Sequence, residues 1–165
     1  MSDRLMTLDV ETYNAEEDER LPIEEREHFD VCFVCTGNTC RSPMAEAYYN
    51  HAKGNGRRVA VSAGVAPHPG DPISPLAAAA LAAAGIESCE ENDYLSHVAR
   101  EIDDGIFECC DRVVAMTSQI AFVLMLNFPL YASQITTLGE DVRDPYGGDA
   151  AQYEATLDQI ASLIS

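Results

Sequence analysis

The sequence predicts an α/β domain in which a four-stranded parallel sheet carries helices on both faces. Two observations support this fold class. From Phe29 onward, short runs rich in β-branched residues alternate with helical stretches, and those stretches have recognisable first and last residues. A chain of 165 residues is long enough for one well-filled core and short for two. We therefore expect one folded domain over residues 29–165, preceded by an extension over residues 1–28.

Four short apolar runs are the candidate strands. Each has five or six residues, a usual strand length, and each is bounded by turn or helix signals. In chain order they are FDVCFV (29–34), VAVSA (59–63), RVVAM (112–116) and QITTL (134–138).

The first two helices are predicted from serine followed by proline. Ser42-Pro43 and Ser74-Pro75 each supply an N-cap and a proline that suits the first helical position, and Gly85 ends the second helix.

Three further helices complete the pattern. One is expected over residues 96–109, and another follows Thr117 until Pro129 stops it. The last begins near Asp149 and has an apolar stripe at helical spacing, made of Tyr153, Leu157, Ile160 and Ile164.

The charge of the chain excludes some partners. With 28 acidic residues against 10 Lys and Arg, the formal charge is −18, so we expect binding neither to nucleic acid nor to anionic membranes. Residues 1–28 hold ten acids against three arginines and are predicted to be a solvated, acidic N-terminal extension with a composition compatible with flexibility. Neither an export signal nor an apolar run of spanning length occurs, which favours a cytoplasmic location.

The run VCTGNTCRSP (34–43) brackets a Gly-Asn pair with two thiols at the carboxyl end of the first predicted strand. It is compatible with a redox pair, a metal site or a loop that binds a tetrahedral anion. Strand alternation sends Cys32 and Cys35 to opposite faces, which argues against both a metal site and a thioredoxin-like pair. We therefore expect no metal and regard Cys32 as a core residue.

An anion-binding loop explains more of the run. A loop that leaves a strand and enters a helix points successive N–H groups inward, and the helix start adds partial positive charge. Gly37 and Asn38 tolerate the positive φ of such a turn, and Arg41 can offer two donors to the same anion. In that environment Cys35 should exist as a thiolate, with Ser42 donating a hydrogen bond to the sulfur while capping the helix.

The run CTGNTCRSPMAE (35–46) closely resembles the phosphate-binding loop of the low-molecular-weight protein tyrosine phosphatase family. The likeness continues through VSAG (61–64), VAMT (114–117) and DPY (144–146). The resemblance implies the fold of that family, a cysteinyl-phosphate intermediate on Cys35 and no cofactor. It implies that phosphate is bound by Arg41 and by the loop residues Thr36, Gly37, Asn38, Thr39, Cys40 and Ser42.

A proton donor for the leaving group is expected in RDPYGGD (143–149), on the loop after the fourth predicted strand. Asp141, Asp144 and Asp149 all lie in or beside this stretch. The resemblance selects Asp144 as the general acid, and the same carboxylate would then activate water.

Thr39 and Tyr146 are the predicted specificity residues. Thr39 stands where tyrosine-directed members usually have an aliphatic residue, and Tyr146 is followed by two glycines instead of further aromatic side chains. A hydroxyl suits a planar guanidinium better than an aryl ring. In these features the chain looks like the bacterial protein-arginine phosphatase branch, so phosphorylated proteins, with phosphoarginine foremost, are the expected substrates. Phosphotyrosine is the alternative.

Two other functions fit the same loop. A thioredoxin-coupled arsenate reductase would need further cysteines near the third strand, where residues 113–129 have none. A phosphocarrier would have no evident need of both Arg41 and Asp144. Cys40 is a candidate redox partner, because it could capture a sulfenic acid formed on Cys35.

Overall fold

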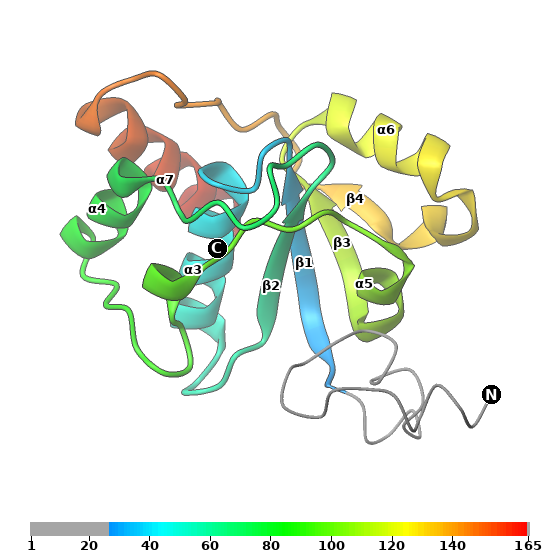
Figure 1. Ribbon diagram of the computed structural model, residues 1–165, viewed down its shortest axis with the longest axis horizontal. Helices are drawn as coiled ribbons and strands as arrows, with labels where there is room; N and C mark the ends of the chain where they lie inside the picture. Colours follow the sequence, from blue (N-terminus) through cyan, green and yellow to red (C-terminus); the bar gives the residue numbers. More distant parts are fainter. Residues whose placement is uncertain (1–26, 165) are drawn as a thin grey trace.

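The computed structural model describes residues 27–164, and these residues form one sheet with helices on its two sides (Figure 1). The strands pair in the order β2-β1-β3-β4, and every pairing is parallel. Their bounds are β1 (Phe29–Cys35), β2 (Ala60–Gly64), β3 (Cys110–Ala115) and β4 (Ile135–Thr137). The predicted four-stranded parallel sheet is confirmed, although β3 begins two residues before its predicted start. The acidic extension, residues 1–28, lies outside the described residues except for Glu27 and His28.

The helices divide between the two faces, as predicted. Figure 1 shows α3, α4 and α7 on one side of the sheet and α5 and α6 on the other. Their bounds are α3 (Arg41–Lys53), α4 (Pro75–Ala83), α5 (Asp104–Cys109), α6 (Ser118–Asn127) and α7 (Ala150–Ile164), with short 3₁₀ turns η2 (Tyr94–Ser96) and η3 (Pro129–Gln134).

The core lies along β1 and β3, the two central strands. Val31, Phe33, Val113 and Val114 are at most 1% exposed, because helices cover both faces of these strands. Such double burial explains why most of β1 and the second half of β3 are continuous apolar runs. The register pairs Cys35 with Gly64, so the loops that follow β1 and β2 leave the sheet side by side.

The predicted helix over residues 96–109 is wrong in its first half. Only Asp104–Cys109 is helical, and the Asp103 carboxylate caps it by accepting a hydrogen bond from the backbone N–H of Ile106 at 3.1 Å. The preceding residues run extended and bridge to the last residue of β2, through Glu101 with Gly64, and to the segment after it, through Val98 with Pro72. These backbone bonds replace those that a longer helix would make.

The predicted N-cap at Ser42 is also wrong. Helix α3 begins at Arg41, two residues before the predicted first helical residue Pro43, and Ser42 lies inside its first turn. The Ser42 hydroxyl instead contacts the side chains of Cys35 and Asn38. Ser74 does occupy the N-cap position of α4 with Pro75 as the first helical residue, but its side chain makes no capping bond.

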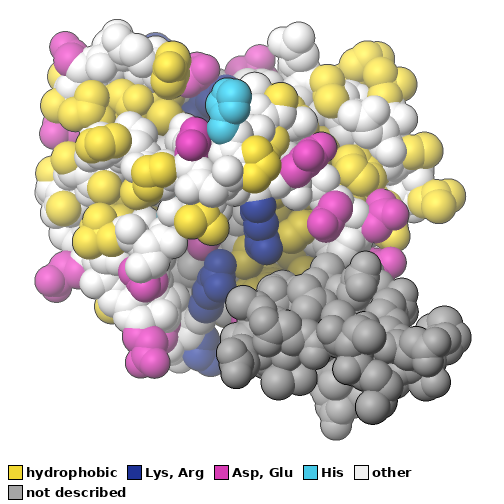
Figure 2. Space-filling view, viewed as in Figure 1, with side chains coloured by type: hydrophobic (Ala, Val, Ile, Leu, Met, Phe, Trp, Pro, Cys, Tyr) yellow, Lys and Arg dark blue, Asp and Glu magenta, His cyan; other side chains and the backbone are white. Residues whose placement is uncertain are grey.

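The surface carries the acidic character of the sequence. Figure 2 shows Asp and Glu side chains scattered over one face, with a small central group of Lys and Arg side chains. Between residues 27 and 164, the structure contains no helix with the length and apolar character that crossing a membrane requires.

Candidate active site

The loop between β1 and α3 turns sharply around Asn38. Asn38 has φ 58°, which asparagine tolerates better than most residues, and its side chain is fully buried. Gly37 does not have positive φ, so that part of the prediction is wrong. The loop rests directly on Gly64, where an added Cβ would lie 2.6 Å from the Thr36 carbonyl oxygen and 3.1 Å from Asn38 Cβ.

Cys35 is the last residue of β1 and is only 2% exposed. Its sulfur accepts a hydrogen bond from the backbone N–H of Asn38 at 3.3 Å and lies 2.9 Å from Ser42 Oγ. Hydrogen-bond donors directed at a sulfur stabilise its anionic form. The predicted contact between Ser42 and the Cys35 sulfur is therefore present.

A buried chain of hydrogen bonds fixes the Ser42 hydroxyl. The Asn38 side-chain amide donates to Ser42 Oγ at 2.9 Å and to Ser62 Oγ at 3.0 Å. Ser62 in turn donates to a carboxylate oxygen of Glu46 at 2.6 Å. Both amide hydrogens of Asn38 are used in these two bonds. Since the Ser42 oxygen accepts one of them, the Ser42 hydroxyl proton remains available for the Cys35 sulfur.

Two residues of the extended 97–102 segment hold Asn38 from the other side. The backbone N–H of Arg100 donates to the Asn38 side-chain oxygen at 3.0 Å, and the His97 ring lies 2.8 Å from the Asn38 carbonyl oxygen. The sequence does not predict these contacts of His97 and Arg100, because its pattern predicts a helix over residues 96–109. Sequence reasoning did not assign a role to Ser62 or Glu46 either. Both lie within motifs that carry the family resemblance, VSAG (61–64) and CTGNTCRSPMAE (35–46), and these motifs could have identified them.

Arg41 is 7% exposed and faces the loop after β4. One guanidinium nitrogen donates to the Val142 carbonyl oxygen at 3.4 Å, and the other lies 3.5 Å from a carboxylate oxygen of Asp144. The structure thus brings together the predicted phosphate-binding cation and the predicted general acid, although 103 positions separate them in the sequence.

The three candidate aspartates have different surroundings. Asp141 accepts a hydrogen bond from the backbone N–H of Ser118 at 2.8 Å, and Asp149 accepts one from that of Gln152 at 3.0 Å, so both serve local structure. Of the three, only Asp144 lines the cavity that also contains Cys35. Its side chain is 55% exposed, and one oxygen accepts the N–H of Tyr146 at 3.1 Å.

That cavity has a volume of about 350 Å³. Its floor is the loop from Cys35 to Arg41, which includes the predicted phosphate-binding residues Thr36, Gly37, Asn38, Thr39 and Cys40. Asp144 and Tyr146 form part of its wall, and Tyr146 is 80% exposed. His68 and Asp71 line the wall as well, and sequence reasoning did not identify them.

Cys40 is buried beside α7. Its sulfur lies 3.4 Å from the Tyr153 hydroxyl, to which Ser74 Oγ also donates a hydrogen bond at 3.4 Å. Burial, followed by the hydrogen bond with Cys40, raises the pKa of Tyr153 above its ordinary value, so the phenol stays neutral and can donate to the sulfur.

The remaining cysteines form no second reactive pair. Cys32 is fully buried within β1, as predicted. Cys110 is the first residue of β3, whereas the predicted strand, residues 112–116, begins two residues after it. A hydrogen bond with Cys109 lowers the pKa of Cys110, but a hydrogen bond with Cys32 and burial raise it more, so its pKa lies far above the usual range. Cys110 is therefore a poor thiolate.

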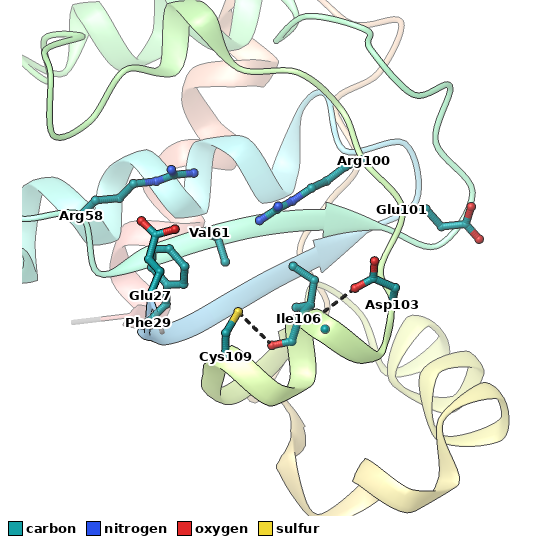
Figure 3. Close-up of a pocket in the computed structure, with 10 residues that line it drawn as sticks. Glu27, Phe29, Arg58, Val61, Arg100, Glu101, Asp103, Ile106 and Cys109 are labelled. Atoms are coloured by element: carbon teal, nitrogen blue, oxygen red, sulfur yellow. Dashed lines mark hydrogen bonds between the residues drawn. The ribbon is translucent and has the colours of Figure 1, made fainter. Parts of the chain in front are cut away.

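A separate cavity of about 260 Å³ contains no residue of the 35–42 loop. In Figure 3, Arg58 and Arg100 approach it from one side, and Ile106 and Cys109 of α5 approach it from the other. Cys109 donates a hydrogen bond to the Ile106 carbonyl oxygen at 3.6 Å.

Among residues 27–164, no group of three or more His, Cys, Asp or Glu side chains is arranged to hold a metal ion.

Comparison with known proteins identifies relatives over nearly the whole described region. The model of the low molecular weight phosphotyrosine protein phosphatase family matches residues 30–165. A protein-arginine-phosphatase of Bacillus subtilis is 38% identical over 144 residues, covering 82% of this chain and 91% of the relative. An arsenate reductase of Staphylococcus epidermidis is 30% identical over 134 residues, covering 81% and 91%.

A solved structure has the same fold. It is a mutant of the YwlE arginine phosphatase with a phosphorylated active-site serine, and it is 36% identical to this chain with a TM-score of 0.73. The match covers 82% of this chain and 91% of that one.

Proposed function

The chain belongs to the low molecular weight phosphotyrosine protein phosphatase family and is a cysteine-dependent phosphatase, and we propose that its substrates are proteins phosphorylated on arginine. The observation that carries this proposal is the shared cavity of Cys35, Arg41 and Asp144, which provides a nucleophile, a phosphate-binding cation and an acid. The arginine-phosphatase relative is the more similar of the two curated relatives described above.

In the proposed reaction, the Cys35 thiolate attacks phosphorus while the bond from phosphorus to the guanidino nitrogen breaks. The neutral carboxyl of Asp144 gives its proton to that nitrogen, so the leaving group departs as an arginine side chain. Arg41 and the loop N–H groups neutralise the phosphoryl oxygens. Arg41 is 3.5 Å from a carboxylate oxygen of Asp144, so binding of phosphate would compete with this ion pair, and the freed carboxylate would take up a proton from water before it acts as the acid.

The second step hydrolyses the cysteinyl-phosphate. Asp144, now a carboxylate, removes a proton from water as the oxygen attacks phosphorus, and phosphate and the Cys35 thiolate are restored. Ser42 would stabilise the departing thiolate through its hydrogen bond, for which the 2.9 Å contact is the support. The step uses no metal or cofactor.

Two residues that line the cavity support a preference for arginine, Thr39 on its floor and Tyr146 on its wall. Thr39 is partly buried and lines the cavity with its hydroxyl-bearing side chain, and among residues 27–164 Tyr146 is the only phenol-bearing side chain that lines it. This wall provides little aromatic surface for a phenyl ring and suits a polar, planar guanidinium. The family description itself names phosphotyrosine, which keeps protein-tyrosine phosphatase as the second candidate.

The deciding experiment compares kcat/KM for phosphoarginine and phosphotyrosine in otherwise matched peptides, using the parent and Thr39→Ile. We expect the parent to prefer phosphoarginine and Thr39→Ile to shift the preference toward phosphotyrosine. A parent preference for phosphotyrosine that Thr39→Ile leaves unchanged would remove the arginine assignment. Ser118→Ala, outside the cavity, controls for a general loss of folded protein.

Four further expectations belong to the proposal. Residues 29–165 are the phosphatase domain and residues 1–28 an acidic extension, supported by the family match over 30–165. The enzyme acts in the cytoplasm. It does not act on nucleic acid, and the charge of −18 supports this second expectation. Arsenate reduction is disfavoured because residues 113–129 have no cysteine and the Cys110 thiol resists ionisation. Cys40 protects an oxidised Cys35 by forming a disulfide with it.

A further inference from the structure

The segment after β2 is bonded to the phosphate-binding loop at both ends. The backbone N–H groups of Val65 and Ala66 donate to the carbonyl oxygens of Cys35 and Thr36, each at 3.0 Å. Further along, the N–H of Ser74 donates to the Thr39 carbonyl oxygen at 2.9 Å. The segment from residue 65 to residue 74 is therefore held in register with the loop that would bind phosphate.

Asp71 has a defined backbone position within this segment. Its carbonyl oxygen accepts a hydrogen bond from Ala99 N–H at 2.7 Å, and its own N–H donates to the His68 carbonyl oxygen at 3.2 Å. The next residue, Pro72, bridges to Val98. These bonds fix the Cα of Asp71 from two sides, so its short side chain has little freedom to leave the cavity that it lines.

The Asp71 carboxylate is exposed and, among the described residues, has neither a hydrogen-bond nor an ion-pair partner. Asp144, the other carboxylate on the cavity wall, is paired with Arg41 and bonded to Tyr146 N–H. The cavity thus contains one carboxylate with a role in proton transfer and a second that no other residue uses. An acidic group is a poor neighbour for an incoming phosphate, so its presence needs a cationic ligand group to balance it.

We infer that Asp71 is a specificity residue that pairs with the guanidinium of the substrate. This inference rests on the proposed function, because it concerns the cationic part of the same substrate. When Asp144 gives its proton to the bridging nitrogen and the bond to phosphorus breaks, the leaving side chain is a full guanidinium cation. A carboxylate that is not itself donating the proton stabilises this charge throughout the step.

The experiment uses Asp71→Asn, which keeps the shape of the side chain and removes the charge. Its matched control is Glu91→Gln, which removes one charge from an exposed turn residue that does not line the cavity. We expect the ratio of kcat/KM for phosphoarginine peptide to kcat/KM for phosphotyrosine peptide to fall by about threefold to fivefold in Asp71→Asn and not in Glu91→Gln, a range typical of partly exposed ion pairs.

A binding readout separates this inference from the proposed function. With para-nitrophenyl phosphate as the reporter substrate, inhibition by N-acetyl-arginine amide should weaken in Asp71→Asn, while inhibition by inorganic phosphate should stay the same or strengthen, because the lost charge repels phosphate. If both the selectivity ratio and the arginine-amide inhibition equal those of the parent, Asp71 has no such role. If the parent does not hydrolyse phosphoarginine yet arginine-amide inhibition depends on Asp71, the proposed function fails and the guanidinium contact stands.

Discussion

Ser42 Oγ lies 2.9 Å from Cys35 Sγ while it accepts a hydrogen bond from the side-chain amide of Asn38. The accepted bond leaves the Ser42 proton free to point at the sulfur, where it stabilises negative charge. Ser42 also lies 3.4 Å from the Ala63 carbonyl oxygen, a longer and weaker alternative for the same proton.

Replacing Ser42 with alanine removes the one side-chain hydroxyl that, in the described part of the chain, is bonded to Cys35. We expect kcat/KM for any aryl phosphate to fall by about tenfold, the usual effect of losing one hydrogen bond to a charged group. Steady-state kinetics of Ser42→Ala beside Ser74→Ala would measure this, because Ser74 bonds to Tyr153 and not to Cys35. Equal losses in the two variants would contradict a specific role for Ser42.

Gly64 has no room for a side chain, because its Cβ would lie 2.6 Å from the Thr36 carbonyl oxygen. In Gly64→Ala the loop must move away from β2, which should lower stability by about 1 to 3 kcal/mol and lower activity at the same time. Gly37→Ala is the matched control for stability, since its nearest contact would be Thr39 Oγ1 at 3.9 Å. Thermal unfolding of both variants tests this, and a Tm for Gly64→Ala at or above that of Gly37→Ala would refute the crowding.

Asp144→Asn keeps the shape of the proposed acid and removes its proton. For a phosphoarginine peptide, whose leaving nitrogen needs protonation, kcat should fall by about a hundredfold to ten-thousandfold. For para-nitrophenyl phosphate, whose leaving group is already a weak base, the loss in the first step should be much smaller. Single-turnover measurements on both substrates reveal the difference.

Asp149→Asn is the control for this prediction. Asp149 accepts a hydrogen bond from Gln152 N–H at the start of α7, and asparagine caps helices about as well. It should keep nearly full activity on both substrates. An Asp144→Asn enzyme that loses the same factor on both would show that Asp144 acts by holding Arg41 and not as the acid.

The sequence predicted the sheet and the loop from Cys35 to Ser42 because their signals are local. Buried β-branched runs identify strands, and the run from Cys35 to Ser42 lies on one continuous stretch of chain. The order of the strands and the helices on both faces then follow from the rules for parallel sheets.

What the sequence did not predict depends on contacts between distant segments. Residues 97–102 have the composition of a helix, but they run extended because the backbone of Gly64 and the side-chain oxygen of Asn38 offer hydrogen-bond partners that no local pattern reveals. Asp71 and His68 were missed for the same reason, since the backbone bonds that tie their segment to Cys35, Thr36 and Thr39 bring them to the cavity. Ser42 was predicted to cap α3, but the early start of the helix at Arg41 leaves its hydroxyl for Cys35.

The Tyr153 hydroxyl provides a prediction about pH. Burial and the hydrogen bond with Cys40 raise its pKa above the ordinary 10.0, so the folded protein keeps this proton at a pH where the unfolded chain loses it. The folded state therefore binds more protons above pH 10.0, and the free energy of unfolding must decrease as the pH rises through that region.

In Tyr153→Phe the contribution of this phenol to the pH dependence of the free energy of unfolding disappears. Urea unfolding at several pH values between about 9 and about 11 should give a shallower decline for the variant than for the parent. The raised pKa of Tyr94 is common to both proteins, so it cancels in the difference, and parallel curves would show that the Tyr153 proton is not held more tightly in the folded state.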